Sequence, residues 1–385
     1  MLKCRLIGWV VLTLVISAEA QNTEQIPKNM PEHNGQFSAW TLYNPDNPVP
    51  LLAGSRYIPQ LNYAISLNKN NKIDFEVSAN IFGNIGYRSI DSISTHGGIR
   101  TYRAWGRYSS KQLEVRIGLQ KINFGSATML RPLRWFDQVD PRDPLLLTNG
   151  VWGVLGRYYF LNNTNIWLWC LYSNHSVKGI EFLTTKKGYP EFGGRVQYPV
   201  SSGEAGLSFH HRMADSRNLN NTIPEYDVIP ENRIGLDARW DKVIGVWIEG
   251  VWVNKGENLG KYSNREIFTA GTDYTFGIGS GLSIIAEHMV IANDEKAFSF
   301  RDATNFSALT LSYPIGMFDK LTFITYFDWH NKSAYRFVNW QKEFNKTSLY
   351  IMGYWNPIDS MLPVTSSEEN ILGGAGIQLL FAFNH

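Results

Sequence analysis

The feature that most constrains this chain is an alternation of apolar and polar side chains along nearly its whole length. Residues 73–82, 113–120, 204–212, 233–241 and 320–330 all place apolar side chains at every second position and polar or charged ones between them. Successive side chains of a β-strand point to opposite faces, so this period predicts strands with one apolar and one polar face. A helix would spread the same charges all round its surface.

Two further segments, 166–172 and 244–253, are apolar on both faces. We expect their second face to meet packed aromatic residues or a folded loop instead of water. The whole chain is therefore predicted to be all-β.

The composition favours a membrane barrel over a soluble sheet protein. The 385 residues include 13 Trp, 19 Tyr, 21 Phe and 33 Gly, and after the N-terminal run no apolar stretch approaches twenty residues. Segments of about ten alternating residues with many aromatics are typical of transmembrane β-barrels, in which one face meets lipid and the other the lumen. Soluble β-sandwiches also alternate, but they rarely use so many strands of this length.

Connection lengths predict the number of strands. Short connections, such as 68–71 and 201–203, alternate with long ones, such as 121–151 and 174–192. Single-chain bacterial barrels have an even strand number, short periplasmic turns and long outer loops. The 17 clear segments begin with a short connection, so a first strand is expected at 36–43 with 44–55 as the first outer loop. The prediction is an antiparallel barrel of 18 strands, or 16 if two weak segments merge.

The two ends of the chain carry targeting signals. Lys3 and Arg5 precede an apolar run at 6–16 and then Ala18-Glu19-Ala20, which predicts a secretory signal peptide at 1–20. We expect residues 21–35 to be a periplasmic lead and 36–385 to be the barrel. The last strand, 371–383, alternates and ends in Phe381 and Phe383. It resembles the signal that the bacterial barrel assembly machinery reads, so the predicted location is the outer membrane, with its lipid around the wall.

The longest connection, 121–151, is the candidate functional segment. Proline fixes the backbone angle φ, so Asp140-Pro141-Arg142-Asp143-Pro144 is expected to be a stiff element. Its candidate constriction residues are Arg131, Arg134, Asp137, Asp140, Arg142 and Asp143. Fixed charges at a narrow point determine which solutes pass, so the loop is a candidate pore constriction. The alternative is an external lid whose Arg–Asp pairs only hold it together.

This region resembles a known family. The strand end at 118–125, Gly-Leu-Gln-Lys-Ile-Asn-Phe-Gly, and the later Asp140-Pro141-Arg142-Asp143 are similar to the alginate-export-type outer-membrane channels. The resemblance implies an 18-stranded channel. Those exporters line the pore with an excess of Arg and Lys, whereas the inward-facing positions predicted here carry both signs of charge.

Three arginines form a second candidate feature of the pore. Arg103, Arg107 and Arg116 fall on adjoining predicted strands and could form a basic ladder near the root of the loop. The competing interpretation is that Glu114 and neighbouring acids neutralise them.

No catalytic, metal or cofactor signature stands out. There is no Gly-x-Ser-x-Gly and no His-Glu-x-x-His motif, and the formal net charge of +2 does not indicate a nucleic-acid partner. We expect a non-enzymatic channel for passive diffusion or export of hydrophilic solutes, either saccharides or anions, without a cofactor. The alternative is a closed barrel that binds a surface partner through the aromatics Trp135, Phe136, Tyr189 and Phe192.

Overall fold

The structure is a computed structural model that describes residues 31–89, 92–217, 223–358, 362 and 372–385. The predicted signal peptide and residues 21–30 of the predicted lead lie outside the described residues. No helix in the described ranges has the length and apolar character needed to cross a membrane.

The strands, in chain order, are β1 (Glu32–Tyr43), β2 (Leu51–Ser66), β3 (Lys72–Ser89), β4 (Ser92–Ser109), β5 (Leu113–Gln120), β6 (Val151–Tyr159), β7 (Asn165–Leu171), β8 (Thr184–Thr185), β9 (Glu191–Val200), β10 (Gly203–Asp215), β11 (Ile229–Asp241), β12 (Gly245–Lys255), β13 (Asn264–Phe276), β14 (Leu282–Asp294), β15 (Thr304–Pro314), β16 (Asp319–Asp328), β17 (Ser333–Glu343), β18 (Thr347–Asn356) and β19 (Gly374–Asn384). A single turn of 3-10 helix, η1 (Gly260–Tyr262), lies between β12 and β13.

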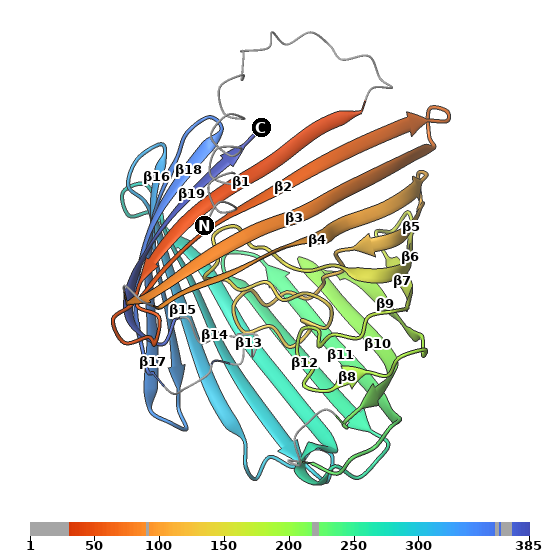
Figure 1. Cartoon of the computed structure of the whole chain (residues 1–385). Helices are drawn as coiled ribbons and strands as arrows, with labels where there is room; N and C mark the ends of the chain where they lie inside the picture. The colour runs from red at the N-terminus through yellow and green to blue at the C-terminus, as the bar shows by residue number, and fades with distance from the viewer. Residues whose placement is uncertain (1–30, 90–91, 218–222, 359–361, 363–371) are drawn as a thin grey trace. The chain divides into compact units, whose positions relative to one another are not determined.

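The strands form one closed antiparallel barrel (Figure 1). Each strand pairs with its sequence neighbours, and β1 pairs with both β2 and β19, which closes the sheet. The two-residue β8 lies in the connection between β7 and β9, and β7 and β9 pair directly with each other. The wall therefore contains 18 strands, which confirms the count from connection lengths.

The first hairpin differs from its predicted bounds. β1 begins at Glu32, so the barrel does not start at 36, and residues 32–35 of the predicted lead already contribute to the wall. The reason is the register, because Glu32 to Gly35 pair with Asn62 to Pro59 of the 16-residue β2. β2 in turn starts at Leu51, which shortens the first outer loop to 44–50.

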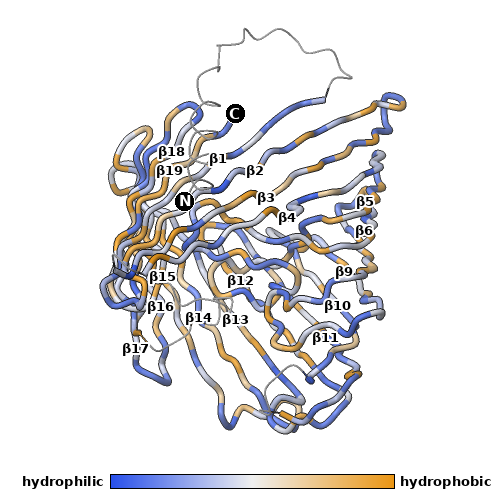
Figure 2. The backbone as a smooth tube through the Cα atoms, in the orientation of Figure 1, coloured by the Kyte–Doolittle hydropathy of each residue, from blue (hydrophilic) through white to orange (hydrophobic). Residues whose placement is uncertain are grey.

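Hydrophilic and hydrophobic residues are interspersed along the strands, as the colours in Figure 2 show. This alternation assigns the side chains to two faces of the wall. On β12, Val246 and Ile248 are exposed on the outer face, whereas Trp247 and Glu249 are buried on the inner face. In transmembrane β-barrels the outer positions are apolar and the inner positions face the lumen, and the exposed apolar side chains of this strand follow that pattern.

The lumen contains apolar packing. One cluster joins Met129 and Leu130 to inner-face residues of β13–β19 and to Leu42 of β1. A second joins aromatic residues of the 121–150 segment to β6, β7 and β12. The inner faces of the two-sided apolar segments, with Trp169 and Val251, belong to this second cluster, which confirms that they meet a folded loop.

Candidate functional site

The segment 121–150 folds into the lumen (Figure 1). It can do so because β5 has 8 residues, whereas the neighbouring β4 has 18, so the chain leaves the wall early. From there it reaches β12 and β14, far round the barrel from β5. The loop therefore lies inside the barrel, as the constriction hypothesis predicted, and does not form an external lid.

Two buried carboxylates hold the loop against the far wall. Glu287 of β14 accepts hydrogen bonds from the backbone N–H groups of Thr128 at 2.7 Å, Met129 at 3.0 Å and Leu130, and it also accepts bonds from the Thr128 hydroxyl and the Trp247 indole. Glu249 of β12 accepts the Ala127 N–H at 2.7 Å and the Leu133 N–H at 3.3 Å.

Both carboxylates are only 3% exposed. A buried backbone N–H that loses its acceptor is costly, so these carboxyl oxygens satisfy donors that would otherwise be unpaired. The pair therefore fixes residues 127–133 across the lumen.

Gly125 permits the close approach of the loop to this wall. Its φ is +102°, in the region that favours glycine, and a Cβ there would lie 2.4 Å from Glu249 Oε1. A larger residue at this position would push the carboxylate away from the Ala127 N–H that it accepts.

Aromatic residues complete the attachment. Trp135 is fully buried, and its ring packs edge-on against Phe124 and Phe136. Phe136 also packs edge-on against Trp169 of β7. Trp135 and Phe136 were assigned to a surface-binding loop in the alternative hypothesis. That assignment is wrong for both, because they are anchors inside the barrel.

The candidate charges of the loop are mostly tied to one another. Arg131 donates two hydrogen bonds to Asp137, at 2.6 and 3.0 Å, and Arg142 makes a salt bridge of 2.6 Å with Asp140. Arg134 is buried, at 5% exposed. These groups stiffen the loop and do not form a ring of open charges.

Asp143 caps the following turn, since its carboxylate accepts the N–H groups of Leu145 and Leu147 at 3.0 and 3.1 Å. Burial raises the pKa of the Asp143 carboxyl, because the charged form has lost water. The Asp-Pro-Arg-Asp-Pro element is therefore an ordered pair of hydrogen-bonded turns, as the prolines predicted.

Two of the three predicted wall arginines are compensated by acidic side chains. Arg107 donates to Asp74 at 2.6 Å, and Glu114 lies within 3.1 Å of Arg116 and 3.7 Å of Arg157. Arg103 donates instead to the backbone carbonyls of Tyr102 and Thr148. The geometry thus favours the interpretation in which acidic side chains neutralise these arginines, and it does not favour a continuous basic ladder.

A second segment in the lumen was not predicted. Glu181, in the connection between β7 and β9, makes salt bridges of 3.0 Å with Arg212 and 2.7 Å with Arg233 on the inner wall. The neighbouring Ile180 donates its N–H to the carbonyl of Arg134 at 3.0 Å. This segment therefore supports the first loop from one side.

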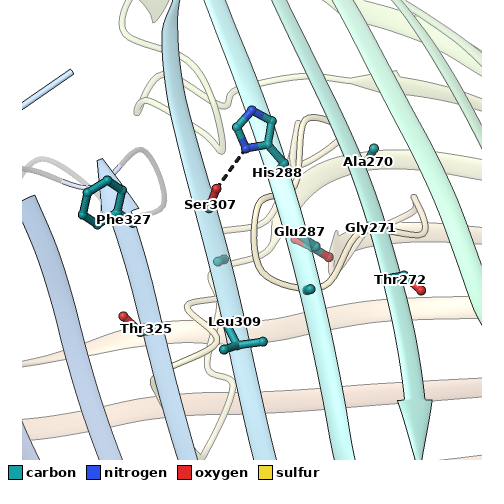
Figure 3. A pocket seen from close by; sticks show the side chains of 11 residues that line it. Ala270, Gly271, Thr272, Glu287, His288, Ser307, Leu309, Thr325 and Phe327 are labelled. Atoms are coloured by element: carbon teal, nitrogen blue, oxygen red, sulfur yellow. Dashed lines mark hydrogen bonds between the residues drawn. The ribbon is translucent and has the colours of Figure 1, made fainter. Parts of the chain in front are cut away.

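A cavity of about 230 Å³ remains beside the first loop. Its loop side carries Asp140, Arg142 and Asp143, and its wall side carries Trp40 of β1 and Arg56 of β2. A larger hollow lies on the outer face of β13–β16, where His288 and Ser307 share a hydrogen bond of 2.9 Å (Figure 3). The outer hollow is separate from the lumen, because exposed His288 points away from its buried neighbours Glu287 and Met289.

The sequence did contain a signal for the anchoring glutamates. Glu249 is the one charged residue in the apolar segment 244–253, and Glu287 is the one charged residue in 282–291. A single carboxylate on an otherwise apolar inner face must find donors when buried. What the sequence lacks is any indication that those donors come from residues more than 100 positions away.

Comparison with known proteins identifies the fold. No protein-family model matches this sequence, and no curated protein sequence matches it. Among solved structures, OccAB2 of Acinetobacter baumannii aligns over 94% of this chain and 99% of its own, with a TM-score of 0.54 and 9% identity. OmpT, described as an outer membrane protein of Vibrio cholerae in its trimer form, aligns over 93% and 100%, with a TM-score of 0.51 and 10% identity.

At these identities the likeness concerns the fold alone. The chain has an outer-membrane-type β-barrel fold. The resemblance to alginate-export-type channels stays a prediction, because neither matched structure tests it.

Proposed function

We propose that this protein is a channel of the bacterial outer membrane that passes small hydrophilic solutes, saccharides or anions, and that 121–151 is its constriction. The observation that carries the proposal is the loop fixed across the lumen by Glu249 and Glu287. A loop anchored in this way narrows a barrel without a separate plug domain. The wide lumen of an 18-stranded wall supports the same reading.

The pairing of charges argues for small solutes over an acidic polymer. Arg107 and Arg116 are compensated by Asp74 and Glu114, and the loop pairs Arg131 with Asp137. A long polyanion would need a continuous run of open cations. The proposal assigns the chain no catalytic role, and it keeps β19 as the element that the assembly machinery reads.

The test is single-channel recording in a planar bilayer, comparing the refolded chain with a variant lacking residues 126–149. Discrete current steps are expected from the full chain, and larger steps from the shortened one. Heat-modifiable migration on a gel establishes that both are folded. Folded protein without current steps would remove the channel proposal.

The absence of current would favour a second candidate, a closed surface-binding barrel. The apolar packing of the loop around Leu130 and Trp135 is the observation that supports it. Its binding surface would have to use exposed aromatics other than Trp135 and Phe136.

A further inference from the structure

One stretch of the barrel wall has a strand edge without a neighbour. β4 has 18 residues and β5 has 8, and the pairing between them covers only Ala104–Ser109 of β4. The first part of β4, Ser92–Arg103, therefore pairs with β3 alone and continues past the end of β5 (Figure 1). We call Ser92–Arg103 the free edge. Within the described ranges no partner strand meets the backbone N–H and C=O groups that it directs away from β3.

The free edge is also open on both faces. Residues 92–97 and 99–101 are all exposed, with Ile93 at 61% and Ile99 at 73%. Elsewhere in the wall the inner face is covered, as at fully buried Trp247 of β12. The constriction loop reaches the base of the free edge, where Arg103 donates to the Thr148 carbonyl at 2.9 Å. The backbone groups beyond this base are thus accessible to another chain.

The usual protection of edge strands is weak here. Proteins commonly protect an edge with proline, lysine, a bulge or a covering segment. The free edge contains neither proline nor lysine, and its one bulge lies at its base, where Tyr102 is skipped in the register with β3. Lipid cannot pair with an open edge, and in water such an edge is a template for a further strand.

The side chains of the free edge define what such a strand should carry. Ile93 and Ile99 share one face, whereas Arg100 lies on the other, 5.4 Å from the Phe82 ring. No acidic residue occurs in the described ranges 77–89 and 92–103. Directly opposite side chains interact across strands, so an acidic residue fits opposite Arg100 and apolar ones opposite the isoleucines. Gly97 leaves space for an aromatic ring from the added strand.

A second copy of this chain does not fit the free edge. Closed oligomers in one membrane are related by an axis along the membrane normal, so all copies have the same orientation. Barrel strands tilt by about 35–45°, and two β4 edges related by such an axis would cross at roughly 70–90°. Strands that cross at this angle cannot form a hydrogen-bonded ladder. A strand from a different protein has no such restriction.

We infer that the free edge of β4 binds an extended segment of a partner protein as an additional strand, with an acidic side chain opposite Arg100 and apolar side chains opposite Ile93 and Ile99. In strand addition of this kind, main-chain hydrogen bonds supply affinity and alternate side chains supply specificity. The surface lies on the wall, so the interaction does not depend on conduction through the lumen.

The probe is a labelled, acetylated peptide, Thr-Glu-Val-Thr-Tyr-Thr-Val-Thr-Val, designed to lie antiparallel to residues 93–101 with Glu opposite Arg100. Fluorescence anisotropy measures its binding to the refolded protein in detergent micelles. A peptide with Pro-Pro in place of the central Thr-Tyr should bind at least about tenfold more weakly, because N–H groups alternate along a strand and one proline must remove a donor that faces β4. Lysine in place of the glutamate should weaken binding about threefold or more.

Two variants separate the charge contact from a general effect. Arg100→Gln should remove the preference for the glutamate peptide over the lysine peptide. Arg88→Gln is the matched control, because Arg88 is also exposed but lies on β3, one strand further from the free edge. This control should keep the preference of the wild-type protein.

Hydrogen exchange locates the bound peptide. The glutamate peptide should slow amide exchange in residues 92–103 and leave β18 unchanged, since β18 is paired on both sides. Equal binding of the proline peptide, or protection confined to other segments, would overturn the inference. Protection of 92–103 that rises with protein concentration in the absence of peptide would also overturn it, because it would identify a second copy as the occupant.

Discussion

Glu287→Gln should release the constriction loop. The carboxylate accepts five hydrogen bonds, three of them from consecutive backbone N–H groups of the loop. An amide keeps one accepting oxygen and replaces the other with an N–H₂ donor. If the amide oxygen takes the Oε1 position, the N–H groups of Met129 and Leu130 lose their acceptor. If it takes the Oε2 position, the donors of Thr128 and Trp247 lose theirs. At least two buried donors are therefore left unpaired in either orientation.

Each such loss costs about 1–3 kcal/mol, so the anchored loop should be destabilised by about 2–6 kcal/mol. At the lower end, a change of about 2 kcal/mol raises the released population roughly thirtyfold. Single-channel recording should therefore show larger or noisier open-channel current than in the unmodified protein. The barrel itself should remain folded, because the strand pairs of β14 do not involve this side chain.

Glu343→Gln is the control for this experiment. Glu343 ends β17, is exposed and hydrogen-bonds Gln341 on its own strand. The Glu343→Gln variant should leave the open-channel current unchanged. Unaltered conductance and noise in folded Glu287→Gln would refute the assignment of Glu287 as the anchor of the loop.

Three further outcomes are expected. Glu114→Gln removes the negative charge that Arg116 and Arg157 share, so the reversal potential in a salt gradient should shift towards anion selectivity. An unchanged reversal potential would mean that these three residues lie outside the ion path. Asp137→Asn weakens the pair of hydrogen bonds that Arg131 donates to Asp137, so the open-channel current should become noisier while the melting temperature of the barrel stays unchanged. Unchanged current noise would count against the Arg131–Asp137 pair as a contact that stiffens the loop. Trp135→Ala empties a fully buried site and should destabilise the fold by about 3–5 kcal/mol, measured by denaturant-induced unfolding, whereas a near-neutral effect would contradict its role as an anchor.

The sequence by itself determined the wall. Alternation is a local property, because each residue's face depends only on its neighbours in the strand. The strand count followed from connection lengths, and it located a first strand at 36–43 that the structure contains within β1. The bounds of β1 were less accurate, since its extension to Glu32 depends on pairing with residues of β2.

Only the tertiary structure decided the site. Loop 121–151 was recognisable by its length, its prolines and its charges, but its position inside the lumen depends on Glu249 and Glu287, more than 100 residues away in sequence. The same applies to the cavity, where Trp40 and Arg56 meet Asp143 across the lumen. Periodicity encodes which face a side chain occupies, whereas closure of the barrel decides which distant side chains share the space inside it.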